Sequence, residues 1–139
     1  MALRRLTLDT SAYASILAAN SQAVAAMQAA DTLLIPAVVL GELLAAFEYG
    51  GRRAENRALL DAFLASPRVQ VMPVTAETAE RYATIYAHLR ATGRPAPTND
   101  LWIAASAMEH GSQLLTADAH FGHMPQIMLQ MLPAGLAHY

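Results

Sequence analysis

Four carboxylates occupy places in the sequence from which they can meet in one site. Asp9 and Asp118 each follow a short apolar stretch that is typical of a buried strand. Glu42 and Asp100 each lie near the start of a stretch with helical periodicity. In an open parallel sheet, the loops beyond the carboxyl ends of the strands form the ligand sites. We therefore expect these four side chains to share one pocket.

Such a pocket predicts divalent cations, because four carboxylates repel one another and a cation relieves that repulsion. Hard oxygen donors suit Mg²⁺, with Mn²⁺ as a substitute. Two such ions about 4 Å apart can activate water and stabilise the leaving oxygen in phosphodiester hydrolysis. Polar side chains beside the acids can orient them or the bound water; these are Thr10, Ser11, Asn99 and Thr116.

Taken one at a time, the same residues have ordinary explanations. The helix dipole favours an acid such as Asp100 at a helix N-terminus, and Asp118 can be a turn residue. His120 and His123 have a spacing that metal ligands use, but no third soft ligand accompanies them, so the pair does not predict a zinc site. We expect His120 together with Phe121 to pack against their own loop.

The rest of the chain supplies the elements that position these residues, as an alternation of short apolar strands and amphipathic helices. The predicted strands cover residues 3–8, 32–35, 69–74, 113–116 and 127–132. The predicted helices cover residues 12–19, 21–30, 38–49, 52–65, 75–90 (with residue 75 as the cap) and 100–110. Alternation of this kind predicts an α/β fold with a parallel sheet covered on both faces.

The helix ends and apolar stripes are predicted as well. Thr10 or Ser11 can cap the first helix, and Thr98 or Asn99 the last. A left-handed glycine is expected at Gly111, where the last helix ends. Inward-facing stripes are expected on the fourth helix (Leu59, Leu60, Phe63, Leu64) and on the fifth (Tyr82, Ile85, Tyr86, Leu89).

Composition sets wider bounds on the protein. At 139 residues it is expected to be one domain with a real core, and the absence of cysteine excludes disulfides and fits the reducing cytoplasm. The longest apolar run, residues 33–47, is too short and too interrupted to span a membrane.

The net charge is −2, but with the four acids set aside nine arginines face seven acids, so the charge of the chain does not exclude RNA as a partner. A hydrophobic fraction of 55% and a mean hydropathy of +0.26 indicate apolar surface reserved for a partner or a second copy.

The segments around the acids share their order and spacing with a known family. They are Leu8-Asp9-Thr10-Ser11, Gly41-Glu42-Leu43, Thr98-Asn99-Asp100-Leu101-Trp102-Ile103-Ala104-Ala105 and Leu115-Thr116-Ala117-Asp118-Ala119-His120-Phe121. Together they resemble the PIN domain, and in particular the VapC toxins of bacterial type II toxin–antitoxin systems. The resemblance covers nearly the whole chain, so residues 1–139 are expected to form a single PIN domain.

The resemblance implies a three-layer fold, with a central parallel sheet of about five strands in the order 3-2-1-4-5 flanked by helices. It implies a Mg²⁺-dependent endoribonuclease that cuts structured RNA, either tRNA or rRNA, and so inhibits translation and growth. Asp9, Glu42, Asp100 and Asp118 would then be the catalytic metal ligands. It also implies a homodimer in the cytoplasm that is silenced by a VapB-type antitoxin wrapped along the helices between residues 12 and 47, with DNA contacted only through that antitoxin.

Two alternatives compete with this interpretation. A phosphoryl-transfer domain with an aspartate nucleophile, such as a haloacid-dehalogenase-like phosphatase or a receiver domain, uses a lysine near the phosphoryl group, and this chain has none. A PIN-like module that binds RNA or a partner without cutting would be expected to lack one of the acids. All four acids are present, so the sequence favours the nuclease.

Overall fold

The computed structural model describes residues 3–133, in which strands and helices alternate as the sequence predicts. The strands are β1 (Arg5–Leu8), β2 (Thr32–Pro36), β3 (Val69–Met72), β4 (Gln113–Thr116) and β5 (Met128–Met131). The helices are α1 (Thr10–Leu17), α2 (Ser21–Ala29), α3 (Ala37–Tyr49), α4 (Arg53–Leu64), α5 (Ala76–Ala91) and α6 (Thr98–Glu109), and the 3₁₀ helix η1 covers Ala119–His123. The predicted boundaries lie within a few residues of these. The segment after Asp118, predicted as a loop, is the helix η1.

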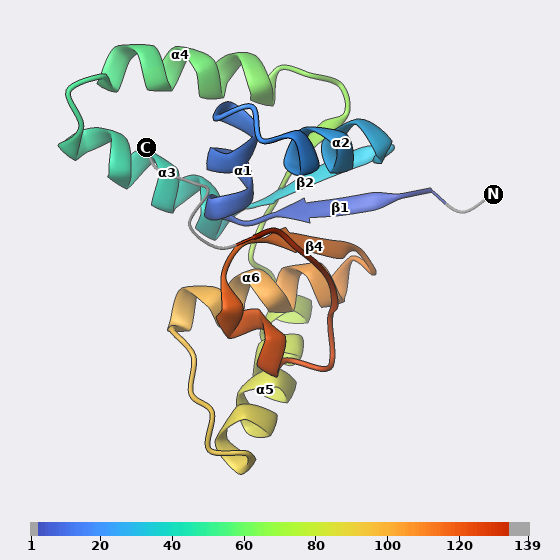
Figure 1. Cartoon of the computed structure of the whole chain (residues 1–139). Helices are drawn as coiled ribbons and strands as arrows, with labels where there is room; N and C mark the ends of the chain where they lie inside the picture. The colour runs from blue at the N-terminus through green and yellow to red at the C-terminus, as the bar shows by residue number, and fades with distance from the viewer. Residues whose placement is uncertain (1–2, 134–139) are drawn as a thin grey trace.

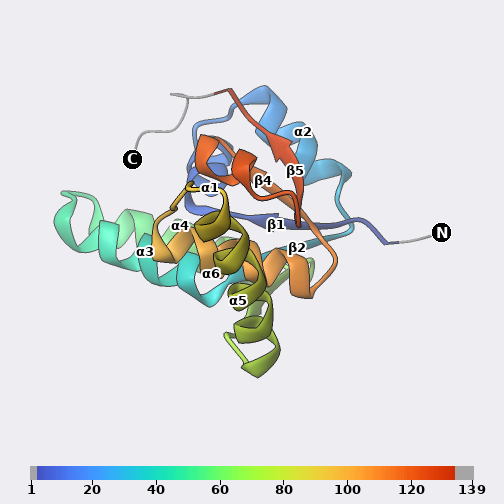
Figure 2. The same cartoon turned by 90° about the horizontal axis from the view of Figure 1, so that it is seen from below.

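All five strands pair in parallel, in the order β3-β2-β1-β4-β5, which confirms the expected topology. In Figure 1, helices α1, α2 and α4 lie above β1, α3 lies at the left end of the strands, and α5 and α6 lie below β4; Figure 2 shows the molecule from the α5–α6 side. From β1 the chain adds β2 and β3 on one side of the sheet, and it then adds β4 and β5 on the other side. The two halves meet where β1 pairs with β4, and Leu8 pairs with Leu115 there. The residues that follow these two strands therefore meet at the switch point, where open sheets of this kind form sites.

The core is built on the central strands and not on the edges. The last three residues of β1 and of β4 are buried, as are the last four of β2, because helices cover both of their faces. The edge strands β3 and β5 are mostly exposed or half-buried. The prediction that both sheet faces are covered therefore holds for the centre only. β3 also ends at Met72, short of the predicted residue 74, and the Val71 and Val74 side chains are exposed.

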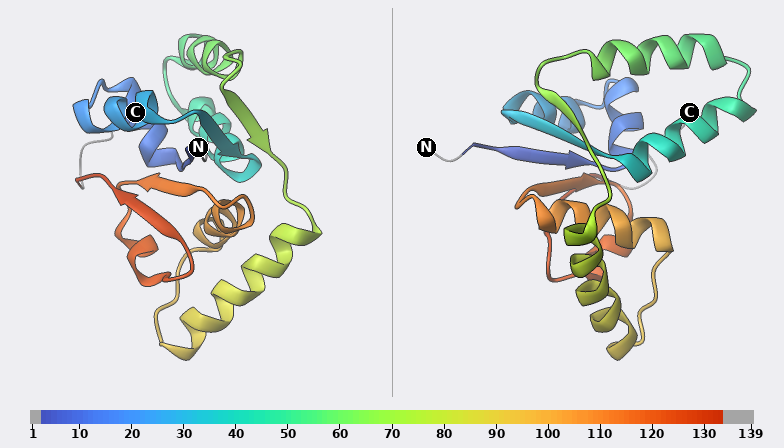
Figure 3. Two further views of the ribbon diagram at one scale, coloured as in Figure 1. Left: turned by 90° about the vertical axis from the view of Figure 1, so that its right-hand side faces the viewer. Right: turned by 180° about the vertical axis from the view of Figure 1, so that it is seen from behind.

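Helices α3 and α4 form a hairpin that projects beyond the carboxyl ends of the strands (Figure 3, right). One predicted inward residue on α4 is wrong: Leu60 is buried, but Leu59, at the margin of the apolar stripe, is exposed. On α5, likewise, Ile85 and Leu89 are buried and Tyr86, at the margin of its stripe, is exposed. Among residues 3–133, no helix is both long and apolar enough to cross a membrane.

The first helix is capped by Asp9, and not by either of the predicted residues, Thr10 and Ser11. The Asp9 carboxylate accepts a hydrogen bond from the backbone N–H of Ala12 at 2.8 Å. Thr10 and Ser11 are instead the first two residues inside the helix, and their hydroxyls donate to Glu42 and to Asp9. The end of β1 and the start of α1 therefore share one carboxylate.

The start of α6 also differs from the prediction. Pro97 stands at the N-cap, and no side chain of the described residues caps the helix, so Thr98 and Asn99 lie inside its first turn. The Asn99 amide points elsewhere, because it donates to Glu42 at 3.3 Å. The other end agrees with the prediction: Gly111 has φ +59°, the left-handed conformation expected beyond a helix C-terminus.

Candidate metal-dependent active site

The four predicted acids surround one hollow at the carboxyl ends of β1 and β4. The hollow has a volume of about 260 Å³ and is lined by Asp9, Thr10, Ser11, Glu42, Asp100, Ile103 and Asp118. Asp9 and Asp118 arrive from adjacent strands, Glu42 from α3 and Asp100 from the first turn of α6. Residues from four separate parts of the sequence therefore meet as the strand-end argument predicts.

Asp9 is the most deeply placed of the four, with 4% of its surface exposed. Both of its carboxylate oxygens are occupied: Oδ1 accepts from the Ala12 N–H and from the Ser11 hydroxyl at 2.7 Å, and Oδ2 accepts from the Thr116 hydroxyl. Burial raises the pKa of Asp9, and the three hydrogen bonds from Thr116, Ala12 and Ser11 oppose that rise. The carboxylate is therefore held in a fixed position before any ligand binds.

Thr116 and Ser11 also join the two strand ends. The Thr116 hydroxyl accepts from the Asp118 N–H at 2.9 Å while it donates to Asp9. The Ser11 hydroxyl accepts from the Ala117 N–H at 2.9 Å while it donates to Asp9. Because each hydroxyl links one strand end to the other, the spacing between Asp9 and Asp118 is fixed by hydrogen bonds as well as by the sheet.

Glu42 is held from two sides. One carboxylate oxygen accepts from the Thr10 hydroxyl at 2.7 Å and the other from the Asn99 amide at 3.3 Å. These donors come from the start of α1 and the start of α6, so Glu42 connects both helix starts to α3. All four polar residues predicted to support the acids therefore contact one: Thr10 and Asn99 contact Glu42, and Ser11 and Thr116 contact Asp9.

Asp100 differs from its neighbours because one of its oxygens is not satisfied. Its side chain is 13% exposed, and its buried Oδ2 accepts no hydrogen bond from the described part of the chain. Burial raises the pKa of Asp100 to about 6, and the charge of Asp118 adds to the rise. His120 opposes that rise, while Glu42 and Asp9 contribute to it. An unsatisfied carboxylate among other acids is the electrostatic setting that a cation relieves.

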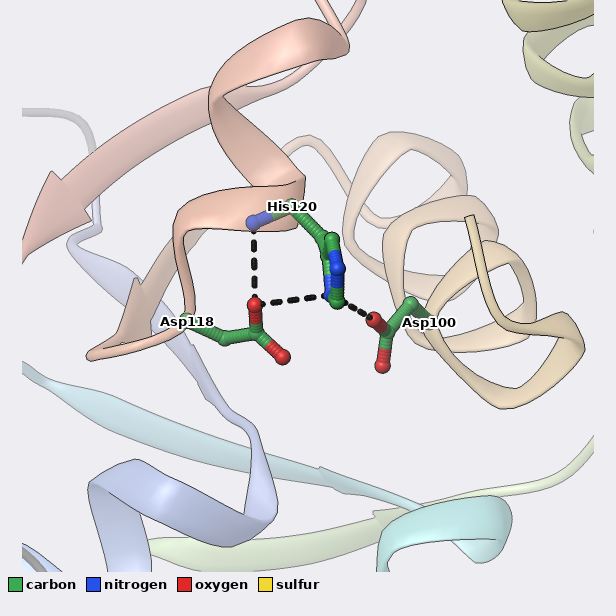
Figure 4. Close-up of side chains that lie close together, drawn as sticks. All are labelled: Asp100, Asp118 and His120. Carbon is green, nitrogen blue, oxygen red and sulfur yellow. Dashed lines mark hydrogen bonds and ion pairs between the residues drawn. The ribbon is translucent and has the colours of Figure 1, made fainter. Parts of the chain in front are cut away.

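His120 is the site residue that the sequence prediction missed. Its Nδ1 lies 3.0 Å from Asp118 Oδ1 and 3.3 Å from Asp100 Oδ2, so the ring sits between the two acids (Figure 4). The expectation that His120 and Phe121 pack their loop holds for Phe121, which is fully buried, and is wrong for His120, whose side chain is 52% exposed. The sequence feature that could have indicated this role is the position of His120 two residues after Asp118, because a tight turn there brings the side chain back toward that acid.

The donor set fits a divalent cation. Asp100, Asp118 and His120 each offer a ligand atom within 4.8 Å of the other two. The unsatisfied Asp100 oxygen provides a free acceptor, and carboxylate oxygens are the donors that Mg²⁺ and Mn²⁺ prefer. Asp9 and Glu42 line the same hollow and supply further oxygens.

Comparisons with known proteins agree with this geometry. The family model described as the PIN domain matches residues 6–127. Ribonuclease VapC4 of Mycobacterium tuberculosis is 35% identical over 94 residues, which are 67% of this chain and 72% of that protein. The VapBC-5 toxin–antitoxin structure from Mycobacterium tuberculosis contains a chain that is 26% identical, with a TM-score of 0.75, over 92% of this chain and 98% of that one. A chain of VapBC2 from Rickettsia felis, solved with a promoter DNA fragment, has a TM-score of 0.77 at 23% identity over 91% of this chain and 98% of that one.

Proposed function

The chain belongs to the PIN-domain family and, within it, to the VapC ribonucleases, and from that premise we propose that it is a Mg²⁺-dependent endoribonuclease that acts as a toxin. The observation that carries the proposal is the meeting of four carboxylates in one hollow, one of them with an unsatisfied buried oxygen. The four carboxylates repel one another, and a cation bound among them would relieve that repulsion.

Each residue has a distinct part in this proposal. Asp9, Glu42, Asp100 and Asp118 hold the cations through their oxygens. A bound Mg²⁺, or Mn²⁺ in its place, neutralises phosphate charge and activates water for phosphodiester hydrolysis. Thr116 and Ser11 keep the Asp9 carboxylate oriented, and Thr10 and Asn99 do the same for Glu42.

The substrate and partners follow from the family and from the charge balance. We infer that the substrate is a structured RNA, tRNA or rRNA, whose cleavage stops translation in the cytoplasm. With the four acids neutralised by cations, nine arginines face seven acids, so the protein no longer repels a polyanion. A VapB-type antitoxin and a second copy of the chain are the proposed partners, since the related structures are VapBC complexes and the chain is rich in apolar residues.

RNA cleavage by purified protein tests the proposal. Mg²⁺ or Mn²⁺ should support cleavage of total tRNA and rRNA, and EDTA should abolish it. Asp9→Asn should lower the rate by about 100-fold or more, because it removes an anionic ligand from the site. Asparagine also caps helices, so the fold should survive, which circular dichroism verifies.

The matched control is Asp61→Asn, which removes a carboxylate from an exposed pair with Arg57 on α4. Its cleavage rate should equal that of the wild type. Cleavage that persists in EDTA, or an Asp9→Asn variant as active as the Asp61→Asn control, would contradict the proposed mechanism.

A further inference from the structure

His120 is held against the two acids by more than its ring. Helix η1 begins directly after Asp118, and the Asp118 carboxylate accepts from the backbone N–H of His120 at 2.9 Å. The same Oδ1 lies 3.0 Å from the His120 ring nitrogen (Figure 4). Phe121, which is fully buried, fixes the next residue of the turn. The backbone of η1 therefore brings His120 beside the two acids, and its ring lies against both of them.

The distances around Nδ1 are those between neighbouring ligands of one metal ion. Two donors bonded to a cation at about 2.1 Å lie about 3.0 Å apart at a right angle and about 3.4 Å apart at a tetrahedral angle. The His120 nitrogen is 3.0 Å from Asp118 Oδ1 and 3.3 Å from Asp100 Oδ2. The second of these oxygens is the one that accepts no hydrogen bond from residues 3–133. These two distances, with all three residues offering ligand atoms within 4.8 Å of one another, place His120 where it can share a cation with the two acids.

We propose that His120 is a nitrogen ligand to the cation held by Asp100 and Asp118, and that it makes this position favour first-row transition ions over Mg²⁺. The inference rests on the proposed metal-dependent function. Imidazole nitrogen binds ions such as Mn²⁺ and Co²⁺ more strongly than it binds the harder Mg²⁺, which prefers oxygen and retains its water. A site built only of carboxylates lacks that source of discrimination.

His123 provides a matched control on the same turn. It is exposed like His120 and lies at the end of η1, but its Nδ1 lies 3.1 Å from an Arg94 guanidinium nitrogen and it is not among the residues grouped around Asp100 and Asp118. His120→Ala and His123→Ala therefore remove the same side chain from the same short helix. Both side chains are exposed, so both variants should fold, and their thermal unfolding in EDTA checks this.

Metal binding in the absence of RNA tests the proposal. In calorimetric titrations, His120→Ala should weaken Co²⁺ binding by about 10- to 100-fold, the size of loss that follows removal of a metal-site partner. Mg²⁺ affinity should change by less than about 2-fold, because oxygen and water remain its preferred ligands. His123→Ala should leave both affinities unchanged. Pulsed electron paramagnetic resonance of bound Mn²⁺ should show ¹⁵N coupling in protein labelled with ¹⁵N-histidine, and His120→Ala should abolish that coupling.

The outcomes separate this inference from the proposed function. Mn²⁺ bound without nitrogen coupling, or a Co²⁺ to Mg²⁺ affinity ratio that His120→Ala leaves unchanged, would overturn the histidine ligand while the nuclease proposal stands. Nitrogen-coupled Mn²⁺ binding in a protein that cuts no RNA would support the ligand and contradict the nuclease. Failure of the wild type to bind any of these ions would overturn both.

Discussion

Replacing Asp100 with asparagine should stabilise the metal-free protein. The pKa of Asp100 rises from 3.8 to about 6 in the folded chain, chiefly through burial. A carboxyl that binds its proton more tightly when folded makes the folded state less stable as the pH rises from about 4 to about 6, and that loss persists at higher pH. At 1.36 kcal/mol per unit of pKa, the loss is about 3 kcal/mol at pH 7.5.

The Asp100→Asn substitution removes the charge and keeps the shape of the side chain, but the new amide still has to be desolvated. We therefore expect a gain of about 1–2 kcal/mol in the free energy of unfolding at pH 7.5. For a chain of this size, that is a rise in melting temperature of about 3–8 °C. Thermal unfolding in EDTA measures it. The exposed control Asp61→Asn should change stability by less than about 0.5 kcal/mol.

The pH and metal dependence separate this explanation from a general stabilising effect. At pH 4.5, Asp100 is mostly protonated in the folded wild type, so the advantage of the variant should shrink toward zero. Saturating Mg²⁺ should stabilise the wild type more than the variant, because a ligand that binds the folded state more tightly stabilises it more. An Asp100→Asn protein that melts at or below the wild-type temperature in EDTA at pH 7.5 would refute the reasoning. So would an advantage of equal size at both pH values.

Two further changes test the support of the site and its partners. Thr116→Val removes the hydroxyl that joins Asp9 to the Asp118 backbone, so metal affinity and cleavage should fall by about 10- to 100-fold. Thr116→Ser keeps a hydroxyl and should retain most activity. A valine variant as active as the wild type would argue against an orienting role. By light scattering, the purified chain should be at least a dimer and should form a stable complex with the product of the adjacent small gene, whereas a well-behaved monomer that ignores that product would contradict both proposed partners.

The sequence predicted most of the fold because its local signals agree with the final structure. Period-two and period-3.6 patterns identify the strands and helices, and Gly111 marks the end of α6. The strand order was implied by the family resemblance and not by the pattern itself, since alternation alone does not say which strands are neighbours. Once β1 and β4 are adjacent, the acids that follow them have to meet.

Errors arose where tertiary position decides what a local pattern can only suggest. Leu59 and Tyr86 follow the apolar periodicity of their helices but lie exposed at the margins of the stripes they belong to. Asn99 has the side chain of a helix cap, yet its amide donates to Glu42, a residue 57 positions away along the chain. A competing long-range hydrogen bond leaves no trace in the local sequence.

His120, at the edge of the site, shows the same limit, and the surroundings of Asp9 and Asp100 differ in a way that the sequence does not reveal. Both carboxylate oxygens of Asp9 accept hydrogen bonds from within the folded chain, so Asp9 is positioned before a cation binds. Asp100 instead has a buried oxygen without a hydrogen bond among the described residues, and the nearest ring nitrogen to it belongs to His120. Because a buried acceptor without a partner costs about 1–3 kcal/mol, the fold leaves at Asp100 an interaction that a ligand can complete. Asp9 is thus held by hydrogen bonds within the chain. Asp100 and His120 form the part of the site that a bound cation would stabilise most.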